Sequence, residues 1–154
     1  AMRAFAARSI LPEHNGLSLD PKRWSSTHMP MEIREPVWFG ERMWAEKESN
    51  SVIVVEGVFD GLRLDREFPD LPFAAFHYLQ QPQQAYDKLA FRYKHIIALT
   101  DSDPTGDLMA KTLKDCVLAS GSKTSVIRAR LKFKDPASAS SKNLREVVES
   151  ALKL

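Results

Sequence analysis

An unbroken apolar run that ends abruptly in a carboxylate constrains the fold of this chain more than any other feature. Residues 51–57 read SVIVVEG, so four consecutive β-branched residues lead directly into Glu56 and Gly57. A continuous apolar run, rather than an alternating one, is typical of a parallel strand that is covered on both faces. We therefore expect Glu56 to lie at the carboxyl edge of an open α/β sheet, where such sheets place their functional groups.

A second apolar run ends in acids in the same way. Residues 95–99 read HIIAL and are followed by TDSD at 100–103. If the two strands are neighbours, Glu56, Asp101 and Asp103 meet at one edge of the sheet. Carboxylates a few ångströms apart repel each other by about 1–4 kcal/mol per pair, so such a cluster favours a bound cation. The oxygen-rich set of side chains predicts a hard divalent cation.

The remaining pattern alternates strands and helices. We expect helices at 58–68, 82–92, 103–118 and 143–152, and further strands at 73–76 and 124–129. This alternation predicts an α/β fold, with a mostly parallel sheet and helices on both of its faces.

Caps and apolar stripes support the expected helices. Asp103 and Pro104 suit the cap and first residue of the third helix, and Asn143 with Glu146 resembles a capping box. The apolar residues expected to pack on the sheet are, helix by helix, Val58, Phe59, Leu62 and Leu64; Leu108, Met109, Leu113 and Val117; and Leu144, Val147, Val148, Ala151 and Leu152.

The first third of the chain is irregular, with weaker strand signals. Residues 22–24 and 36–44 mix basic and aromatic side chains, a mixture that suits the binding of a nucleic-acid strand. It equally suits a small subdomain whose core is made of Trp24, Trp38, Phe39 and Trp44. We expect 2–50 to be an N-terminal segment and 51–154 to be the α/β domain.

Composition excludes several classes of protein. The chain has 154 residues, enough for one core of ordinary size. No apolar run approaches the roughly 20 residues that a membrane span needs. The formal net charge of +2 is too small to identify a nucleic-acid partner, and the single cysteine, Cys116, can form neither an internal disulfide nor a zinc site. We expect a cytoplasmic protein without an export signal or a membrane partner.

The acid motifs resemble those of a known superfamily. VEG at 55–57 followed by Asp60, and DSDPTG at 101–106, resemble the glutamate and DxD motifs of the TOPRIM fold, which primases, topoisomerases and certain nucleases share. The extended form EGxxD is most similar to that of bacterial replicative primases and bacteriophage primase-helicases. KDP at 134–136 resembles their third acid motif, and PKRWSS at 21–26 resembles a segment that precedes the motifs in those primases.

The resemblance implies metal-dependent nucleotidyl transfer in the synthesis of RNA primers. It implies that Mg²⁺ or Mn²⁺ is held by Glu56, Asp101, Asp103 and Asp135, and that the catalytic residues are Glu56, Asp101 and Asp103. Contacts to nucleotide or nucleic acid are implied for Arg8, Lys22, Arg23 and Asp60, and structural roles for Gly57 and Gly106. The chain departs from the family pattern at Ala6 and Ala7, which replace glycines, and at Ala137, which replaces a further acid.

The resemblance also implies partners. They are a single-stranded DNA template, nucleoside triphosphates, and a zinc-ribbon-bearing primase part or a helicase. Because Cys116 is the single cysteine, this chain supplies no zinc ribbon of its own. We expect it to be the metal-binding portion of a primase, to prime DNA inefficiently when alone, and to bind single-stranded DNA weakly and with a strong dependence on salt.

Three alternatives remain open. The same acids would serve a TOPRIM nuclease, in which water is the attacking group. A TOPRIM scaffold that binds nucleic acid without catalysis is the second. The third arises because IIALTDSDPT at 96–105 fits the DxDxT signature of haloacid-dehalogenase-type phosphatases, in which Asp101 would be the nucleophile. Those phosphatases carry the motif on their first strand, whereas here a complete βα region with Glu56 precedes it.

Overall fold

The computed structural model describes residues 6–7, 24–25, 38–76 and 81–153. The chain forms two compact units, Ala1–Val37 and Trp38–Leu154. In the first unit, β1 (Ala6–Ala7) pairs antiparallel with β2 (Trp24–Ser25). The implied contacts at Arg8, Lys22 and Arg23, and the side chain of Trp24, lie outside the part of the chain that is described.

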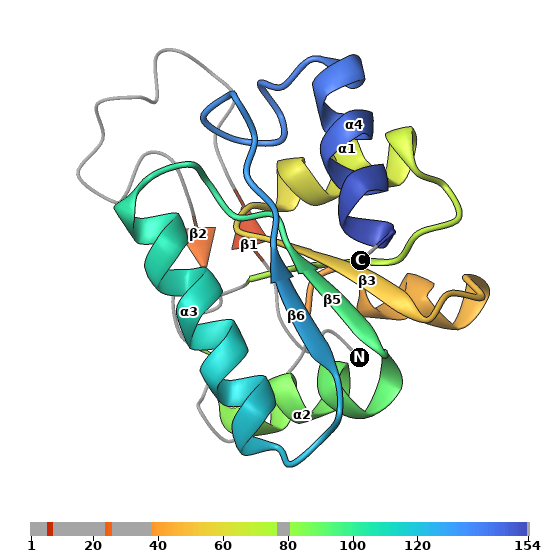
Figure 1. The fold of residues 1–154 in the computed structure, drawn as a ribbon, viewed down its shortest axis with the longest axis vertical. Coiled ribbons are helices and arrows are strands. Elements are labelled where there is room, and N and C mark those ends of the chain that lie inside the picture. Colours follow the sequence, from red (N-terminus) through yellow and green to blue (C-terminus); the bar gives the residue numbers. More distant parts are fainter. Residues whose placement is uncertain (1–5, 8–23, 26–37, 77–80, 154) are drawn as a thin grey trace. The chain divides into compact units, whose positions relative to one another are not determined.

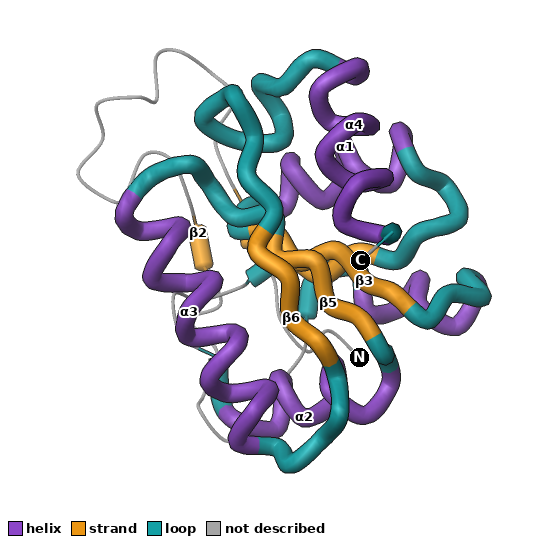
Figure 2. Tube along the Cα trace, in the orientation of Figure 1, coloured by secondary structure: helices purple, strands orange, loops and turns teal. Residues whose placement is uncertain are grey.

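The second unit is built on a parallel sheet (Figures 1 and 2). Its four strands lie in the order β4-β3-β5-β6. They are β3 (Ser51–Val55), β4 (Phe73–Ala75), β5 (His95–Ala98) and β6 (Ser125–Arg128). Each neighbouring pair runs parallel, so the predicted α/β fold is confirmed.

Helices cover both faces of this sheet. They are α1 (Val58–Glu67), α2 (Gln83–Arg92), α3 (Pro104–Ala119) and α4 (Ser141–Leu152). Figure 1 shows α1 and α4 on one side of the sheet and α2 and α3 on the other. Within the described residues, no helix combines the length and the apolar character that crossing a membrane requires.

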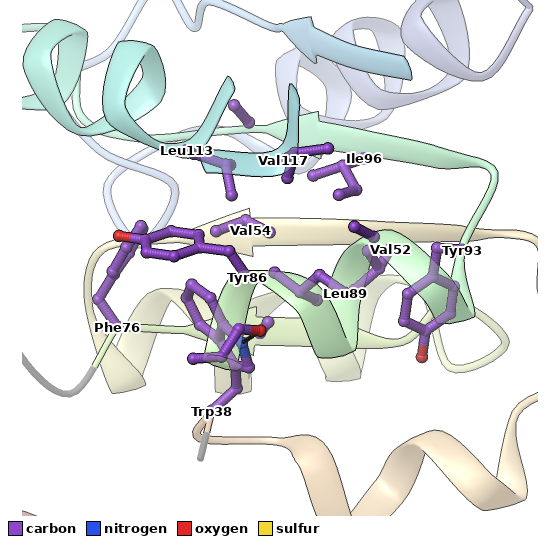
Figure 3. Close-up of a cluster of buried hydrophobic side chains, with 14 of the residues drawn as sticks. Trp38, Val52, Val54, Phe76, Tyr86, Leu89, Tyr93, Ile96, Leu113 and Val117 are labelled. Atoms are coloured by element: carbon purple, nitrogen blue, oxygen red, sulfur yellow. Dashed lines mark hydrogen bonds between the residues drawn. The ribbon is translucent and has the colours of Figure 1, made fainter. Parts of the chain in front are cut away.

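Alternate residues of each strand face opposite helical layers. One cluster joins α2 and α3 to the side chains of Val52, Val54, Ile96 and Ala98 (Figure 3). The other cluster joins α1 and α4 to the side chains of Ile53, Val55, Ile97 and Leu99. The central strands are therefore buried on both faces, which explains why they read as unbroken apolar runs rather than as alternating ones.

Four apolar side chains that were predicted to face the sheet are exposed instead. The exposed fractions are 53% for Phe59, 46% for Leu62, 59% for Leu108 and 41% for Leu152. Helix α1 approaches the sheet through Gly61, where an added Cβ would lie 2.3 Å from the ring of Phe73, and this contact turns Phe59 and Leu62 outward. In α3 the buried stripe follows helical spacing and omits Leu108; it consists of Gly106, Met109, Ala110, Leu113 and Val117.

Helix α4 begins earlier than predicted. Ser140 is its cap, and the Ser140 hydroxyl accepts a hydrogen bond from the amide of Asn143 at 3.2 Å. The predicted capping box of Asn143 and Glu146 is therefore wrong. Asn143 is buried in the first turn, where its Oδ1 accepts a hydrogen bond from the amide of Lys132 at 3.3 Å. The asparagine thus holds the preceding loop rather than the start of the helix.

Trp38 and Trp44 belong to the core of the second unit. Their exposed fractions are 2% and 4%, and each indole N–H donates to a backbone carbonyl at 2.8 Å. Trp44 lies in the 3₁₀ helix η4 (Glu41–Glu46), which follows Gly40. The φ of 98° at Gly40 and its close approach to the Phe73 carbonyl require glycine there. The two tryptophans are core residues, as the core interpretation of the aromatic residues predicts, but their core is that of the parallel-sheet unit rather than that of a small separate subdomain.

Candidate functional site

The structure brings Glu56 and Asp101 together at the carboxyl edge of the sheet. β3 and β5 pair in parallel with Val54 opposite Ala98, so both strands reach this edge together. Glu56 Oε1 accepts a hydrogen bond from the amide of Asp101 at 2.9 Å. This bond joins two acid motifs that are 45 residues apart in the sequence.

Asp103 caps α3, as the sequence predicts. Its Oδ1 accepts a hydrogen bond from the amide of Gly106 at 2.8 Å, and Pro104 is the first residue of the helix. An added Cβ at Gly106 would lie 2.1 Å from the carbonyl oxygen of Asp101 and 2.8 Å from Glu56 Oε1. Glycine at this position therefore allows the helix to start directly against the acids.

Asp60 links the glutamate motif to the loop that follows β6. Its exposed fraction is 8%. One carboxylate oxygen accepts from the amide of Gly57 at 3.2 Å and the other accepts from the amide of Ala137 at 3.0 Å. Burial raises the pKa of Asp60, and the nearby Asp135 carboxylate raises it further. This placement favours a structural role for Asp60, which holds the loop after β6, rather than the implied contact with nucleotide.

The loop at 131–140 carries Asp135 to the same edge. Ser102 fastens this loop, because its amide donates to the Lys134 carbonyl at 2.7 Å and its hydroxyl donates to the Leu131 carbonyl at 3.1 Å. Asp135 lies close enough to raise the pKa of Asp101. The three acid motifs recognised in the sequence therefore share one edge of the sheet.

The cluster is electronegative. Burial raises the pKa of Asp101 to about 7, with further contributions from Glu56, Asp60, Asp135 and Asp103. Burial also raises the pKa of Glu56, and the hydrogen bond from the amide of Asp101 opposes that rise. In the absence of a cation, the folded chain therefore keeps a proton on Asp101 up to near-neutral pH.

The donor set fits a hard divalent cation that keeps part of its water shell. The side chains are carboxylates, which Mg²⁺ and Mn²⁺ prefer. Within 38–76 and 81–153, no three acidic, histidine or cysteine side chains are arranged to hold an ion by themselves. Mg²⁺ sites that handle nucleotides commonly use one or two carboxylates, with waters and substrate phosphates as the other ligands. Two of the three acids Asp101, Asp103 and Asp135 would suffice for a site of that kind.

Arg128 is a site residue that the sequence interpretation missed. It ends β6, and its guanidinium donates to the carbonyls of Thr100 and Asp101 at 2.8 Å each. The available signal is a basic residue at the carboxyl end of an otherwise apolar strand. Two residues further on, Arg130 pairs with Asp107 of α3 at 2.8 Å.

Crowding of the acids predicts that stability depends on pH when metal is absent. The pKa of Asp101 is about 7 in the folded chain and has its ordinary value of 3.8 in the unfolded chain, so between these values the folded state binds more protons. Stability is therefore expected to fall as the pH rises through this window and to level off above it. We expect a loss of about 1–2 kcal/mol, because solvent screens a partly exposed group.

Urea unfolding in the presence of a chelator, at several pH values, measures how steeply the free energy of unfolding falls with pH. Asp101→Asn is expected to flatten this dependence, because the amide does not titrate. Asp115→Asn is the matched control, since Asp115 is exposed and pairs with Lys111 further along α3. An equal slope in the Asp101→Asn variant and the unmodified chain would contradict the crowded placement of Asp101.

Comparison with known proteins gives matches in structure. No protein-family model matches the chain, and no curated protein matches it in sequence. The zinc-binding and RNA polymerase domains of the Aquifex aeolicus primase match with a TM-score of 0.71 and 22% sequence identity, covering 97% of this chain. The primase fragment of the bacteriophage T7 primase-helicase protein matches with a TM-score of 0.55 and 16% identity, covering 76% of this chain.

This chain spans only part of each matched structure. It covers 37% of the Aquifex aeolicus chain and 48% of the bacteriophage T7 chain. At these levels of identity, the likeness is one of fold. The chain therefore shares its α/β fold with these two primase structures, which agrees with the fold that the acid motifs predict.

Proposed function

The chain has a fold found in bacterial and bacteriophage primases, and on this premise we propose that it carries the metal-dependent nucleotidyl-transfer site of a DNA primase. Such a site joins nucleotides into the RNA primers that start DNA replication. The observation that carries the proposal is the hydrogen bond from the Asp101 amide to Glu56 Oε1, at 2.9 Å. It brings the glutamate motif and the DxD motif to one edge of the sheet.

Each acid has a role in the proposed site. Asp101, Asp103 and Asp135 would hold Mg²⁺ or Mn²⁺ through carboxylate oxygens. When bound, the metal would neutralise charge on the nucleotide phosphates and favour ionisation of the attacking hydroxyl. Glu56 uses Oε1 to bind the Asp101 amide, which leaves Oε2 to bind metal or to accept the hydroxyl proton. Asp103 uses Oδ1 for the helix cap, which leaves Oδ2 to bind the metal.

The exposed side chains of the loop that carries Asp135 suit a nucleic-acid substrate. Lys132, Phe133 and Lys134 are exposed beside Asp135, and the exposed fraction of Phe133 is 40%. Lysine side chains attract phosphates, and an exposed aromatic ring stacks on bases. The proposed substrates are a single-stranded DNA template and nucleoside triphosphates. Further proposed contacts to them, on residues outside the described part, are Arg8, Lys22 and Arg23.

A zinc-ribbon-bearing part is the proposed partner. The chain spans 37% of a primase chain that includes a zinc-binding domain, and its single cysteine, Cys116, cannot build a zinc ribbon. We propose that a zinc-ribbon-bearing part, in the same protein or in a partner, or a helicase completes the enzyme. The proposed location is the cytoplasm of a bacterial cell, where bacteriophage primases also act.

Primer synthesis tests the proposed function. Incorporation of labelled nucleotides on single-stranded DNA is measured with Mg²⁺ or Mn²⁺, for the chain alone and together with the zinc-ribbon-bearing part from the same source. We expect weak synthesis by the chain alone, template-directed synthesis by the pair, and loss of both with a chelator. A nuclease assay runs in parallel.

Other outcomes would contradict the proposal. Metal-dependent cleavage of DNA without synthesis would indicate a TOPRIM nuclease. Binding of single-stranded DNA without either activity would indicate a scaffold. Robust template-directed synthesis by the isolated chain would contradict the need for a partner.

Metal addition gives a separate prediction. Mn²⁺ is expected to raise the melting temperature, because an ion that binds the folded chain alone stabilises it by about 1.4 kcal/mol at roughly ten times its Kd. Differential scanning fluorimetry measures the shift. Asp103→Asn is expected to reduce it without unfolding the helix, because asparagine also caps helices. Asp115→Asn should leave the shift intact, and an unchanged melting temperature in the unmodified chain would contradict the metal site.

A further inference from the structure

Arg128 binds mainly the backbone around the acids of the candidate site, rather than the acids themselves. Its guanidinium reaches backbone carbonyls on β5, on the turn that follows β5, and on Ala129 just after β6, and it also reaches one carboxylate. The hydrogen bonds run from Nη1 to the carbonyls of Ala98 (3.3 Å), Thr100 (2.8 Å) and Ala129 (3.2 Å), and from Nη2 to the Asp101 carbonyl (2.8 Å) and Asp107 Oδ1 (3.3 Å).

Two of these bonds lie beyond the end of the sheet. The last register pair of β5 and β6 is Ala98 with Arg128. Thr100 and Asp101 follow β5, where the acid motif leaves the strand. Arg128 therefore fixes the turn that carries Asp101 to the end of β6. Hydrogen bonds from a charged donor are about twice as strong as neutral ones, and the planar guanidinium fixes the direction of both.

The guanidinium is itself held in place. Asp107, in the first turn of α3, accepts from Arg128 at 3.3 Å and from Arg130 at 2.8 Å. Arg128 has an exposed side-chain fraction of 20%, whereas Arg130 has 60%. The two arginines thus carry the same charge and share one carboxylate. Of the two, only Arg128 also donates to the Thr100 and Asp101 carbonyls among the residues that the structure describes.

We propose that Arg128 is a positioning residue that fixes the backbone of Asp101, and thereby the direction of its carboxylate, for binding a divalent cation. The inference rests on the proposed function, because it takes the acids to be the metal site. Asp101 is held from two sides: Arg128 binds its carbonyl, and Glu56 binds its amide at 2.9 Å. Because both peptide groups are fixed, the backbone of Asp101 is already ordered before the cation binds to its carboxylate.

Removing the positive charge of Arg128 separates positioning from simple electrostatics. If charge alone mattered, loss of a cation near the acids would strengthen the binding of Mn²⁺. If positioning matters, the same loss weakens it, because residues that orient metal ligands are typically worth 10- to 100-fold in affinity. The two effects have opposite signs, so the direction of the change decides between them.

The test measures Mn²⁺ affinity by electron paramagnetic resonance on the full chain, with no nucleotide present. Arg128→Met is expected to weaken binding about tenfold. Arg128→Lys keeps the charge and part of the hydrogen bonding, and is expected to recover part of the loss. Arg130→Met is the matched control, because it removes the same charge and the same partner carboxylate contact, and it should bind Mn²⁺ as tightly as the unmodified chain or more tightly.

Three results would overturn the inference. The first is Arg128→Met binding Mn²⁺ as tightly as the unmodified chain. The second is Arg130→Met losing as much affinity as Arg128→Met, which would assign the effect to the shared contact with Asp107 rather than to the bonds with the Thr100 and Asp101 carbonyls. If Arg128→Met does not fold, Arg128→Lys carries the test, and unaltered affinity in that variant is the third. Failure of the proposed function looks different, because then the unmodified chain itself would bind no Mn²⁺ at the acids.

Discussion

Glu56→Gln and Asp101→Asn are each expected to lower primer synthesis by roughly three orders of magnitude while the fold stays intact. Glutamine keeps the carbonyl oxygen that accepts from the Asp101 amide, so Glu56→Gln removes the charge and leaves the bond between the motifs in place. Removal of either charge also relieves repulsion in the metal-free cluster. Nucleotide incorporation by the reconstituted enzyme measures activity, and circular dichroism with thermal unfolding measures the fold.

The control for both variants is Asp115→Asn, which removes an exposed acid on α3. It is expected to keep full activity. If activity is lost because the Glu56 or Asp101 variant unfolds, the acids are structural and the catalytic roles are wrong. A covalent phospho-aspartyl or fluoroberyllate adduct at Asp101 of the unmodified chain would instead decide for a haloacid-dehalogenase-type phosphatase.

Gly106→Ala is expected to destabilise the chain and to disable the site together. An alanine Cβ would lie 2.1 Å from the carbonyl oxygen of Asp101 and 2.8 Å from Glu56 Oε1, so the start of α3 must move away from the acids. Overpacking of this kind costs about 3 kcal/mol, against a gain of about 1 kcal/mol in helix propensity. The expected net loss of about 2 kcal/mol is measured by urea unfolding.

Thr105→Ala is the matched control for this glycine. Thr105 is exposed in the same helical turn, so its replacement should leave both stability and activity nearly unchanged. A Gly106→Ala variant with unaltered or increased stability would show that α3 does not start against the acids as the structure places it.

Much of the candidate site is predictable because its signals are local. The β-branched run before Glu56 and the apolar run before Asp101 each mark a buried parallel strand, and parallel strands present their carboxyl ends at one edge. Asp103 followed by Pro104 is a local helix-start signal, and the structure shows that cap. These features need no knowledge of tertiary contacts.

Other features depend on tertiary contacts that no local pattern encodes. Asp60 lies in a motif that resembles a nucleotide-contacting one, but its buried carboxylate binds the amide of Ala137, 77 residues away. Arg128 reads as an ordinary strand residue until β6 is known to lie beside β5. Leu108 has the apolar character of a core residue, but the buried stripe of α3 passes through Met109 instead, which leaves Leu108 exposed.

The central claim is that acids from three separate motifs form one site for a divalent cation and nucleotide phosphates. Anomalous scattering from manganese, in crystals of the chain grown with Mn²⁺ and a nucleoside triphosphate, tests it most directly. The expected result is a manganese peak bonded to the carboxylate of Asp101, to Asp103 or Asp135, and to phosphate oxygens. A triphosphate and manganese bound elsewhere, with no peak between these carboxylates, would contradict it.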